Sequence, residues 1–122
     1  VVNFVDRNHA KMKELDLSFF EMTAAMAFDY FDQSDVEVAV IETGLGGRLD
    51  ATNLITPILS IVTNVSFDHT EFLGETIEKI AAEKAGIIKK SVPIILGQHS
   101  EAYDKVFVER AQELNSPMIL IL

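Results

Sequence analysis

The stretch VEVAVIETGLGGRLDATN, residues 36–53, joins a run of apolar residues to a carboxylate and then to a glycine-rich loop. Residues 36–41 are mostly β-branched and apolar, which is typical of a strand covered on both faces. Glu42 follows at the carboxyl end of this strand, the edge where open α/β sheets bind ligands. Gly44, Gly46 and Gly47 allow positive φ values and a close approach of backbone to a ligand. The stretch therefore predicts a buried strand followed by a loop of a functional site.

The glycine loop alone does not identify a ligand. Its spacing lacks the third glycine of a dinucleotide fingerprint, and no lysine followed by serine or threonine makes it a phosphate-binding P-loop. A plain strand-to-helix turn with a solvated Glu42 is an alternative interpretation of the same residues.

Apolar segments on both sides of this stretch alternate in the manner of a parallel sheet. Ser18 and Glu21 match a capping box at the start of a helix over residues 18–31, and Ser100 is the expected cap of a helix over 101–114. The further expected elements are a helix over 75–89 and strands over 36–41, 58–62, 93–96 and 118–121. The pattern predicts one α/β domain over residues 1–122, with a mostly parallel sheet and helices on both faces.

The composition limits the classes of function. The chain has 122 residues, of which 48% are hydrophobic, so it is able to form a substantial core. Its formal net charge of -9 argues against binding to nucleic acid or an anionic membrane surface. The absence of cysteine excludes disulfides and thiolate metal sites and is consistent with a reducing compartment. No apolar run approaches the length of a membrane span.

Two further side chains are candidates for chemistry. His69 follows the second expected strand, so it lies at the same sheet edge as Glu42, and a carboxylate and an imidazole can share a metal. A loop histidine bonded to backbone is the alternative. Lys84 lies among alanine and isoleucine residues. A buried lysine amine is a nucleophile that can react with carbon dioxide, and the resulting carbamate is an oxygen ligand suited to magnesium. A lysine that extends to solvent at a helix end is the alternative.

Several separated motifs resemble folylpolyglutamate synthase and dihydrofolate synthase of the Mur ligase superfamily. They are Ser18-Phe19-Phe20-Glu21, IETGLGGRLDATN at residues 41–53, Asp68-His69, LGETI at 73–77 and EKAGIIK at 83–89. These motifs occur in the family's order and spacing and cover nearly the whole chain. The resemblance implies a partial central domain with a fold like that of P-loop NTPases.

The resemblance also implies roles for individual residues. Glu42 corresponds to a magnesium ligand, His69 to a ligand of a second magnesium ion, and Lys84 to a lysine carried as its carbamate at that second ion. Two short segments correspond to the residues with which the family contacts the dihydropteroate substrate. These segments contain Ser18, Phe19, Phe20, Glu21, Leu49, Asp50 and Ala51. The implied cofactor is Mg²⁺, with ATP as co-substrate.

The implied reaction forms an amide between L-glutamate and a carboxylate of dihydropteroate or of a tetrahydrofolate polyglutamate. The family's P-loop and C-terminal domain have no counterpart in this sequence, so we expect the chain to be part of a longer protein and to be inactive alone. For that protein we expect a cytoplasmic monomer. Another Mur-type amino-acid or peptide ligase, and a nonenzymatic binding or assembly module, are the alternatives.

Overall fold

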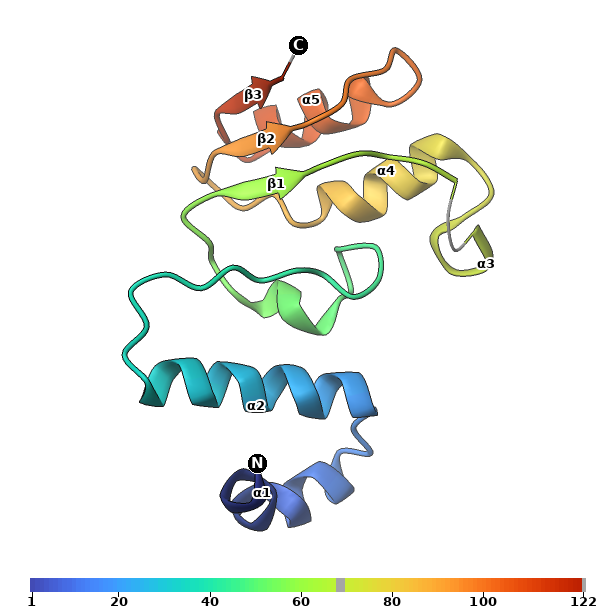
Figure 1. Cartoon of the computed structure of the whole chain (residues 1–122). Coiled ribbons are helices and arrows are strands. Elements are labelled where there is room, and N and C mark those ends of the chain that lie inside the picture. The colour runs from blue at the N-terminus through green and yellow to red at the C-terminus, as the bar shows by residue number, and fades with distance from the viewer. Residues whose placement is uncertain (68–69, 122) are drawn as a thin grey trace.

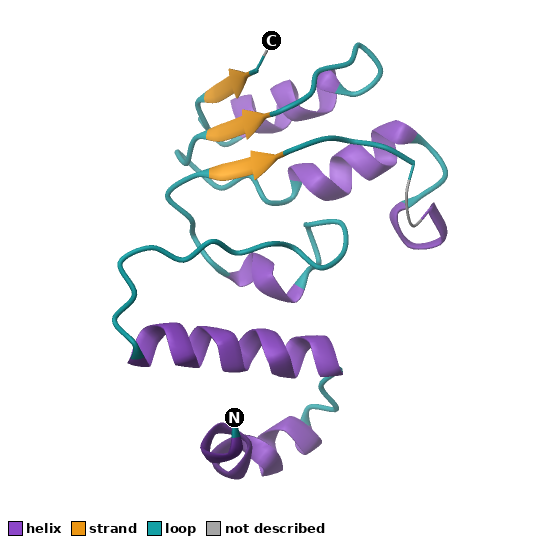
Figure 2. Ribbon diagram, in the orientation of Figure 1, coloured by secondary structure: helices purple, strands orange, loops and turns teal. Residues whose placement is uncertain are grey.

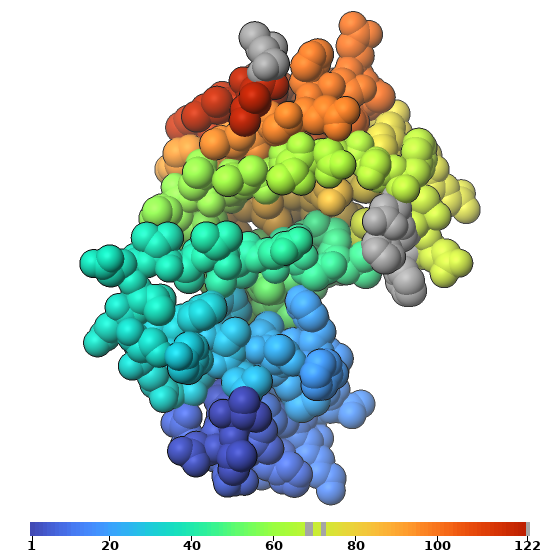
Figure 3. Space-filling model, viewed as in Figure 1, coloured from blue at the N-terminus to red at the C-terminus, as the bar shows by residue number. Residues whose placement is uncertain are grey.

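Helices and a small sheet follow one another along the chain. The structure is a computed structural model that describes residues 1–67 and 70–121 (Figures 1 and 2). Its elements are α1 (Val2–Glu14), α2 (Phe19–Gln33), the short 3-10 helix η1 (Ala51–Leu54), β1 (Ser60–Val62), α3 (Thr70–Leu73), α4 (Ile77–Ala85), β2 (Ile94–Leu96), α5 (Asp104–Glu113) and β3 (Met118–Leu120). The space-filling view places the two N-terminal helices (blue) at one end of the molecule and β3 (red) at the other (Figure 3).

The three strands form a parallel sheet in the order β1-β2-β3. Ile94 of β2 lies opposite Ser60 of β1 and opposite Met118 of β3. Helix α4 connects β1 to β2, and α5 connects β2 to β3, so each crossover between parallel strands contains a helix. The predicted α/β class with a parallel sheet and helices is confirmed.

The hydrophobic core lies between one face of the sheet and helices α4 and α5. Phe107 of α5 and Ile80 of α4 are completely buried, and they belong to one cluster with Ile94 and Leu96 of β2. Burial of such side chains is the main favourable contribution to folding. On the opposite face, Ile61 is 53% exposed, so α4 and α5 cover a single face of the sheet. The expected helices on both faces are therefore not found among the described residues.

Helix α2 begins where the capping box predicts. The Ser18 hydroxyl accepts a hydrogen bond from the Glu21 backbone N–H at 3.2 Å, and a Glu21 carboxylate oxygen accepts one from the Ser18 N–H at 2.7 Å. These two bonds satisfy donors that a helix start leaves free. Helix α1, which precedes α2, has no such signal at Val1 and was not among the expected elements.

The predicted strand over residues 36–41 is wrong. The segment has no regular secondary structure and bends at Glu37, and none of the three strands in the described parts of the chain pairs with it. Val38 is 71% exposed and Val40 is 94% exposed. β-branched residues favour a pleated, half-buried surface, yet a strand also needs a neighbour whose N–H and C=O groups complete the ladder. The β-branched composition of the segment is therefore not sufficient to make it a strand.

The bounds of the remaining elements differ from the expected ones by a few residues. The expected helix over 75–89 corresponds to α4, and the expected strands over 58–62, 93–96 and 118–121 correspond to β1, β2 and β3. Helix α5 begins after Tyr103 and not at Ser100, because the Ser100 carbonyl accepts bonds from the N–H groups of Tyr103 and Asp104 in a separate turn. No helix among residues 1–67 and 70–121 is long and apolar enough to cross a membrane.

Candidate functional site

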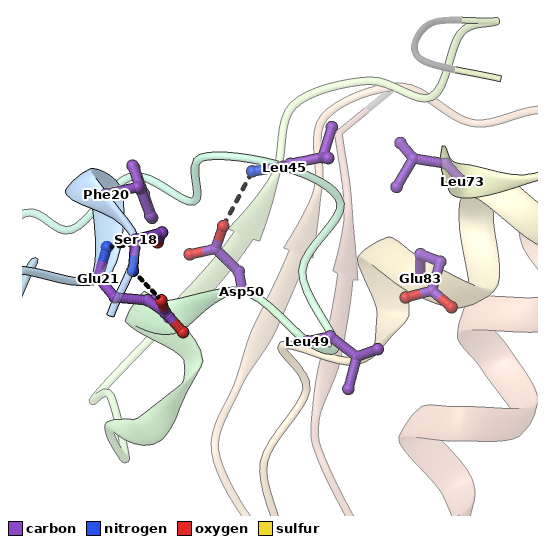
Figure 4. A pocket seen from close by; sticks show the side chains of 9 residues that line it. Ser18, Phe20, Glu21, Leu45, Leu49, Asp50, Leu73 and Glu83 are labelled. Atoms are coloured by element: carbon purple, nitrogen blue, oxygen red, sulfur yellow. Dashed lines mark hydrogen bonds between the residues drawn. The ribbon is translucent and has the colours of Figure 1, made fainter. Parts of the chain in front are cut away.

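A pocket of about 360 Å³ opens between the start of α2 and the glycine-rich loop. This volume is within the range of small-molecule sites. Figure 4 shows side chains of α2 on one side, Leu73 and Glu83 on the other, and the loop residues between them. The lining residues are Ser18, Phe20, Glu21, Leu45, Leu49, Asp50, Ala51, Leu73 and Glu83.

The structure brings together two segments that sequence resemblance had marked as substrate contacts. The residues of this set that line the pocket are Ser18, Phe20, Glu21, Leu49, Asp50 and Ala51. Phe19 does not line it. Its side chain is 82% exposed and borders a separate apolar groove between α1 and α2. Helical geometry accounts for this separation, because adjacent residues of a helix point about 100° apart.

The capping box fixes one wall of the pocket. One Glu21 carboxylate oxygen is bonded to the Ser18 N–H, so the acid is held at the pocket's edge by its own helix start. The hydroxyl and the backbone N–H of Ser18 lower the pKa of Glu21. Glu21 is therefore an anionic acceptor at neutral pH, and Phe20 beside it contributes a half-exposed aromatic ring.

Asp50 organises the opposite wall. One oxygen of its carboxylate accepts hydrogen bonds from the backbone N–H groups of Gly44 and Leu45, each at 2.9 Å, and the other accepts from the Thr52 N–H at 2.9 Å and from the Thr52 hydroxyl at 2.5 Å. Partial burial alone would raise the pKa of Asp50, but these bonds outweigh burial and lower it. A single carboxylate thus closes the loop onto itself and caps η1.

These contacts decide what the glycine loop can bind. A phosphate cradle needs backbone N–H groups that point at the anion, whereas those of Gly44 and Leu45 are bonded to the Asp50 carboxylate. The pocket also contains the carboxylates of Glu21 and Glu83. Because like charges repel, this arrangement suits a ligand with N–H donors and apolar surface better than a polyphosphate.

Asp50→Asn is expected to destabilise the chain by about 1–2 kcal/mol at neutral pH, because the amide cannot accept all of the bonds that the carboxylate accepts. A folded-state pKa below the ordinary 3.8 means that Asp50 stabilises the fold above that pH. This contribution is lost as the pH falls through the lowered value. Denaturant unfolding at several pH values measures the effect.

Asp32→Asn is the matched control for Asp50, because Asp32 is an exposed acid on α2. It should change the unfolding free energy by no more than about 0.5 kcal/mol. The difference between wild type and Asp50→Asn should shrink in acid. A difference that stays constant from neutral pH down to acid would contradict the role of the Asp50 carboxylate.

Glycines allow the loop to lie directly on the last turn of α4. A methyl group at Gly86 would lie 2.4 Å from the Arg48 Cα, and one at Gly47 would lie 2.9 Å from the Glu83 carbonyl oxygen. Gly86 has an ordinary helical conformation, with φ -62°, so its backbone does not require glycine. Close packing between two backbones is the reason that no side chain fits there.

Gly86→Ala is expected to cost about 1–3 kcal/mol of unfolding free energy, although alanine is the better helix former, because the added methyl group overpacks a backbone contact. Gly44→Ala is the control. Its methyl group would meet only the tip of the half-exposed Phe20 ring, at 2.4 Å, and that ring can rotate away. Thermal unfolding compares the two variants, and an unchanged midpoint for Gly86→Ala would be incompatible with the packing described here.

Two of the three expected magnesium ligands, Glu42 and Lys84, lie within the described residues. Glu42 is exposed at the beginning of the loop, and Lys84 is half-buried in the last turn of α4. A methyl group at Gly47 would lie 3.3 Å from the Lys84 Cα, so the loop that follows Glu42 lies against the turn that carries Lys84. His69 lies outside the described residues. Within residues 1–67 and 70–121 no group of three or more His, Cys, Asp or Glu side chains could hold a metal ion.

Three pocket residues were missed by sequence reasoning. Leu45 lies inside the motif at residues 41–53, and Leu73 and Glu83 begin the motifs at 73–77 and 83–89. The resemblance implies substrate contacts for other residues of the chain, and no spacing rule relates residue 45 to residues 73 and 83. The glycines of the loop were the one available signal for these residues. Glycines allow the loop to pack closely on a helix, and such packing brings side chains of that helix to the pocket.

The model of the Mur ligase middle domain family matches residues 9–121. The chain is 38% identical over 112 residues to a dihydrofolate synthase/folylpolyglutamate synthase of Haemophilus influenzae, an alignment that covers 92% of this chain and 24% of that protein. The chain therefore spans about a quarter of the length of this curated relative.

Solved structures show the same fold. A folylpolyglutamate synthase of Thermotoga maritima has a TM-score of 0.86 and 41% identity, over 98% of this chain and 28% of that one. A complex of FPGS with AMPPCP and folate has a TM-score of 0.90 and 38% identity, over 98% of this chain and 31% of that one.

Proposed function

Because the chain belongs to the Mur ligase family, as part of its middle domain, we propose that it belongs to an ATP-dependent ligase that joins L-glutamate to a folate-type carboxylate. The acceptor carboxylate is that of dihydropteroate or of a folylpolyglutamate. The observation that carries this proposal is the pocket between α2 and the loop, because both segments marked by the resemblance line it. Relatives named for these activities, and a solved relative bound to AMPPCP and folate, support it.

The pocket's chemistry suits a pterin ring. Phe20, Leu45 and Leu49 provide apolar contacts for a flat heterocycle, and aromatic rings stack favourably on such surfaces. The amino group and ring N–H of a pterin are hydrogen-bond donors, and the carboxylate of Glu21 is an acceptor. Both oxygens of Asp50 already accept bonds within the loop, so Asp50 contributes by shaping the wall that the ring contacts. In this proposal Ser18 helps to hold Glu21 in place, and Ala51 leaves room beside the ring.

Glu42, Lys84 and His69 are proposed to hold Mg²⁺, with Lys84 as its carbamate. The donor set fits a hard cation, because carboxylate and carbamate oxygens are the ligands that magnesium prefers. Bound magnesium would offset the repulsion between the substrate carboxylate and the triphosphate. The contact between the glycine loop and the Lys84 turn supports a site beside the pocket.

The proposed reaction has two chemical steps. The substrate carboxylate attacks the γ-phosphorus of ATP, which releases ADP and gives an acyl phosphate. The amino group of L-glutamate then attacks the acyl carbon, and the tetrahedral intermediate collapses to the amide with loss of phosphate and a proton. The chain's residues contribute chiefly by holding the pteroate in line and by charge stabilisation.

Binding of the ATP phosphates is assigned to a P-loop outside this sequence, because the N–H groups of Gly44 and Leu45 are occupied. Binding of glutamate is assigned to a C-terminal domain. The 122-residue chain alone is therefore proposed to lack ligase activity, and the complete protein is proposed to be a cytoplasmic monomer.

The test is incorporation of labelled L-glutamate by the complete protein, with ATP and magnesium, into dihydropteroate, tetrahydrofolate and a cell-wall peptide precursor in parallel. Product with the first two substrates, and none after magnesium is chelated, is expected. Product with the peptide precursor alone would favour the other Mur-type ligase. Absence of product with all three, from protein that is folded, would favour a nonenzymatic module.

A further inference from the structure

Arg48 connects the glycine loop to helix α4 by its backbone and its side chain together. Its N–H donates to the Glu83 carbonyl oxygen at 2.8 Å. Its guanidinium donates twice to one Glu83 carboxylate oxygen, from Nη2 at 2.9 Å and from Nε at 3.1 Å. One residue of the loop is thus fixed to one residue of the helix at three points.

A second set of bonds fastens the same segments on the other side of Lys84. The Asn53 amide donates to the Gly86 carbonyl at 3.0 Å and to the Arg48 carbonyl at 3.1 Å. The Lys89 ammonium donates to the Asn53 carbonyl at 2.7 Å. Residues 83 and 86, which flank Lys84 in the chain, are therefore both bonded to the loop. A shift of the loop would move the end of α4 and Lys84 with it.

The Arg48–Glu83 ion pair adjoins both parts of the proposed site. Arg48 directly precedes Leu49, Asp50 and Ala51 of the pocket, and Glu83 directly precedes Lys84 and itself lines the pocket. The Arg48 side chain is 56% exposed. The Glu83 side chain is only 24% exposed, and both guanidinium donors meet one of its oxygens. The pair therefore fixes the position of the loop relative to the helix, whatever it adds to stability.

We propose that Arg48 and Glu83 are positioning residues that hold the pteroate-binding wall at a fixed distance from Lys84. This inference rests on the proposed function, because it concerns how the two halves of that site are placed relative to each other. In this proposal the pair acts on the reaction without contacting the reacting carboxylate or the triphosphate. It acts through Leu49, Asp50 and Ala51 on one side and through Lys84 on the other.

This role has a kinetic signature that a purely structural role lacks. Arg48 does not line the pocket, and Glu83→Gln leaves a side chain of the same size in the pocket wall, so the folate substrate still binds when the pair is broken. What changes is the alignment of the bound carboxylate with the groups around Lys84, and misalignment of about 1 Å can cost about 100-fold in rate. The loss should therefore appear in kcat, with KM for the folate near its wild-type value.

The experiment is a double-mutant cycle in the complete ligase with Arg48→Met, Glu83→Gln and the combined variant. Each single variant should lower kcat by roughly 10- to 100-fold, as positioning partners of metal sites do. The combined variant should be no worse than the more damaged single variant, because the pair acts as a unit. Arg110→Met is the control, since Arg110 forms an ion pair with Glu113 at 3.0 Å on α5, away from the pocket.

Three results would overturn the inference: a kcat for Arg48→Met equal to that of Arg110→Met, losses that multiply in the combined variant, or a loss confined to KM. Arg48→Lys keeps the charge with fewer donors and should recover part of the rate. It replaces Arg48→Met in the cycle if the methionine variant does not fold. A wild-type protein without ligase activity would instead contradict the proposed function, so the two failures are distinguishable.

Discussion

Glu42→Gln in the complete ligase is expected to lower kcat by at least about 100-fold without changing the fold. Loss of a partner behind a metal ligand already costs about 10- to 100-fold, and a change to the ligand itself should cost more. Glu42 is exposed at the beginning of the loop, so an amide of the same size should leave the packing intact. Steady-state kinetics at several magnesium concentrations and a thermal melt measure the two effects separately.

Glu37→Gln is the control for Glu42, because Glu37 is an exposed glutamate in the same segment of the chain. It should retain wild-type turnover. Wild-type turnover in Glu42→Gln would remove Glu42 from the metal site, and a lowered melting temperature would show that its role includes folding.

Phe107→Ala is expected to destabilise the chain by about 3–5 kcal/mol, which is a large part of the stability of a domain of this size. Phe107 is completely buried between the sheet and α4, and its ring lies edge-on to Tyr103 with centroids 6.1 Å apart. Truncation removes apolar burial and leaves a cavity. Denaturant unfolding followed by circular dichroism measures the loss.

Val108→Ala is the neighbouring control, since Val108 is 37% exposed on the same helix. Its cost should be below about 1 kcal/mol. Comparable losses for the two variants would mean that the core is not centred on Phe107.

The parts of the fold that the sequence predicted well carry strong local signals. Ser18 and Glu21 cap α2 by reciprocal bonds that need no tertiary partner, so the start of this helix could be placed within one residue. The strand at Ile94–Leu96 is a short apolar run in the middle of the sheet, where both neighbours are present in the chain. In these two cases local preference and tertiary context favour the same structure.

The failures are positions where a partner decides the outcome. The apolar residues 36–41 predicted a covered strand, but pairing depends on another segment, which the sequence of residues 36–41 does not specify. The start of α5 was misplaced because the Ser100 turn satisfies donors before the helix begins. Leu73 lines the pocket because the loop packs closely against it at Gly46. The spacing of residues in the sequence does not indicate this contact.

The candidate site was predicted mainly by resemblance. Two separated segments were expected to contact one substrate, and they line one pocket. The residues alone are compatible with a plain turn and with a metal site shared by Glu42 and His69. The Asp50 carboxylate closes the glycine loop by accepting bonds from the N–H groups of Gly44 and Leu45. The absence of a side chain at Gly86 lets this loop pack directly on the end of α4.

We propose that the glycine loop and the start of α2 hold the pterin and not the ATP phosphates. The most direct test of this proposal is a crystal structure of the complete protein with dihydropteroate and a nonhydrolysable ATP analogue. We predict the pterin ring between Phe20 and Leu49, with the N–H groups of Gly44 and Leu45 still bonded to Asp50. Triphosphate oxygens bound to those two N–H groups, with the pterin elsewhere, would show that the loop holds the nucleotide and would overturn this proposal.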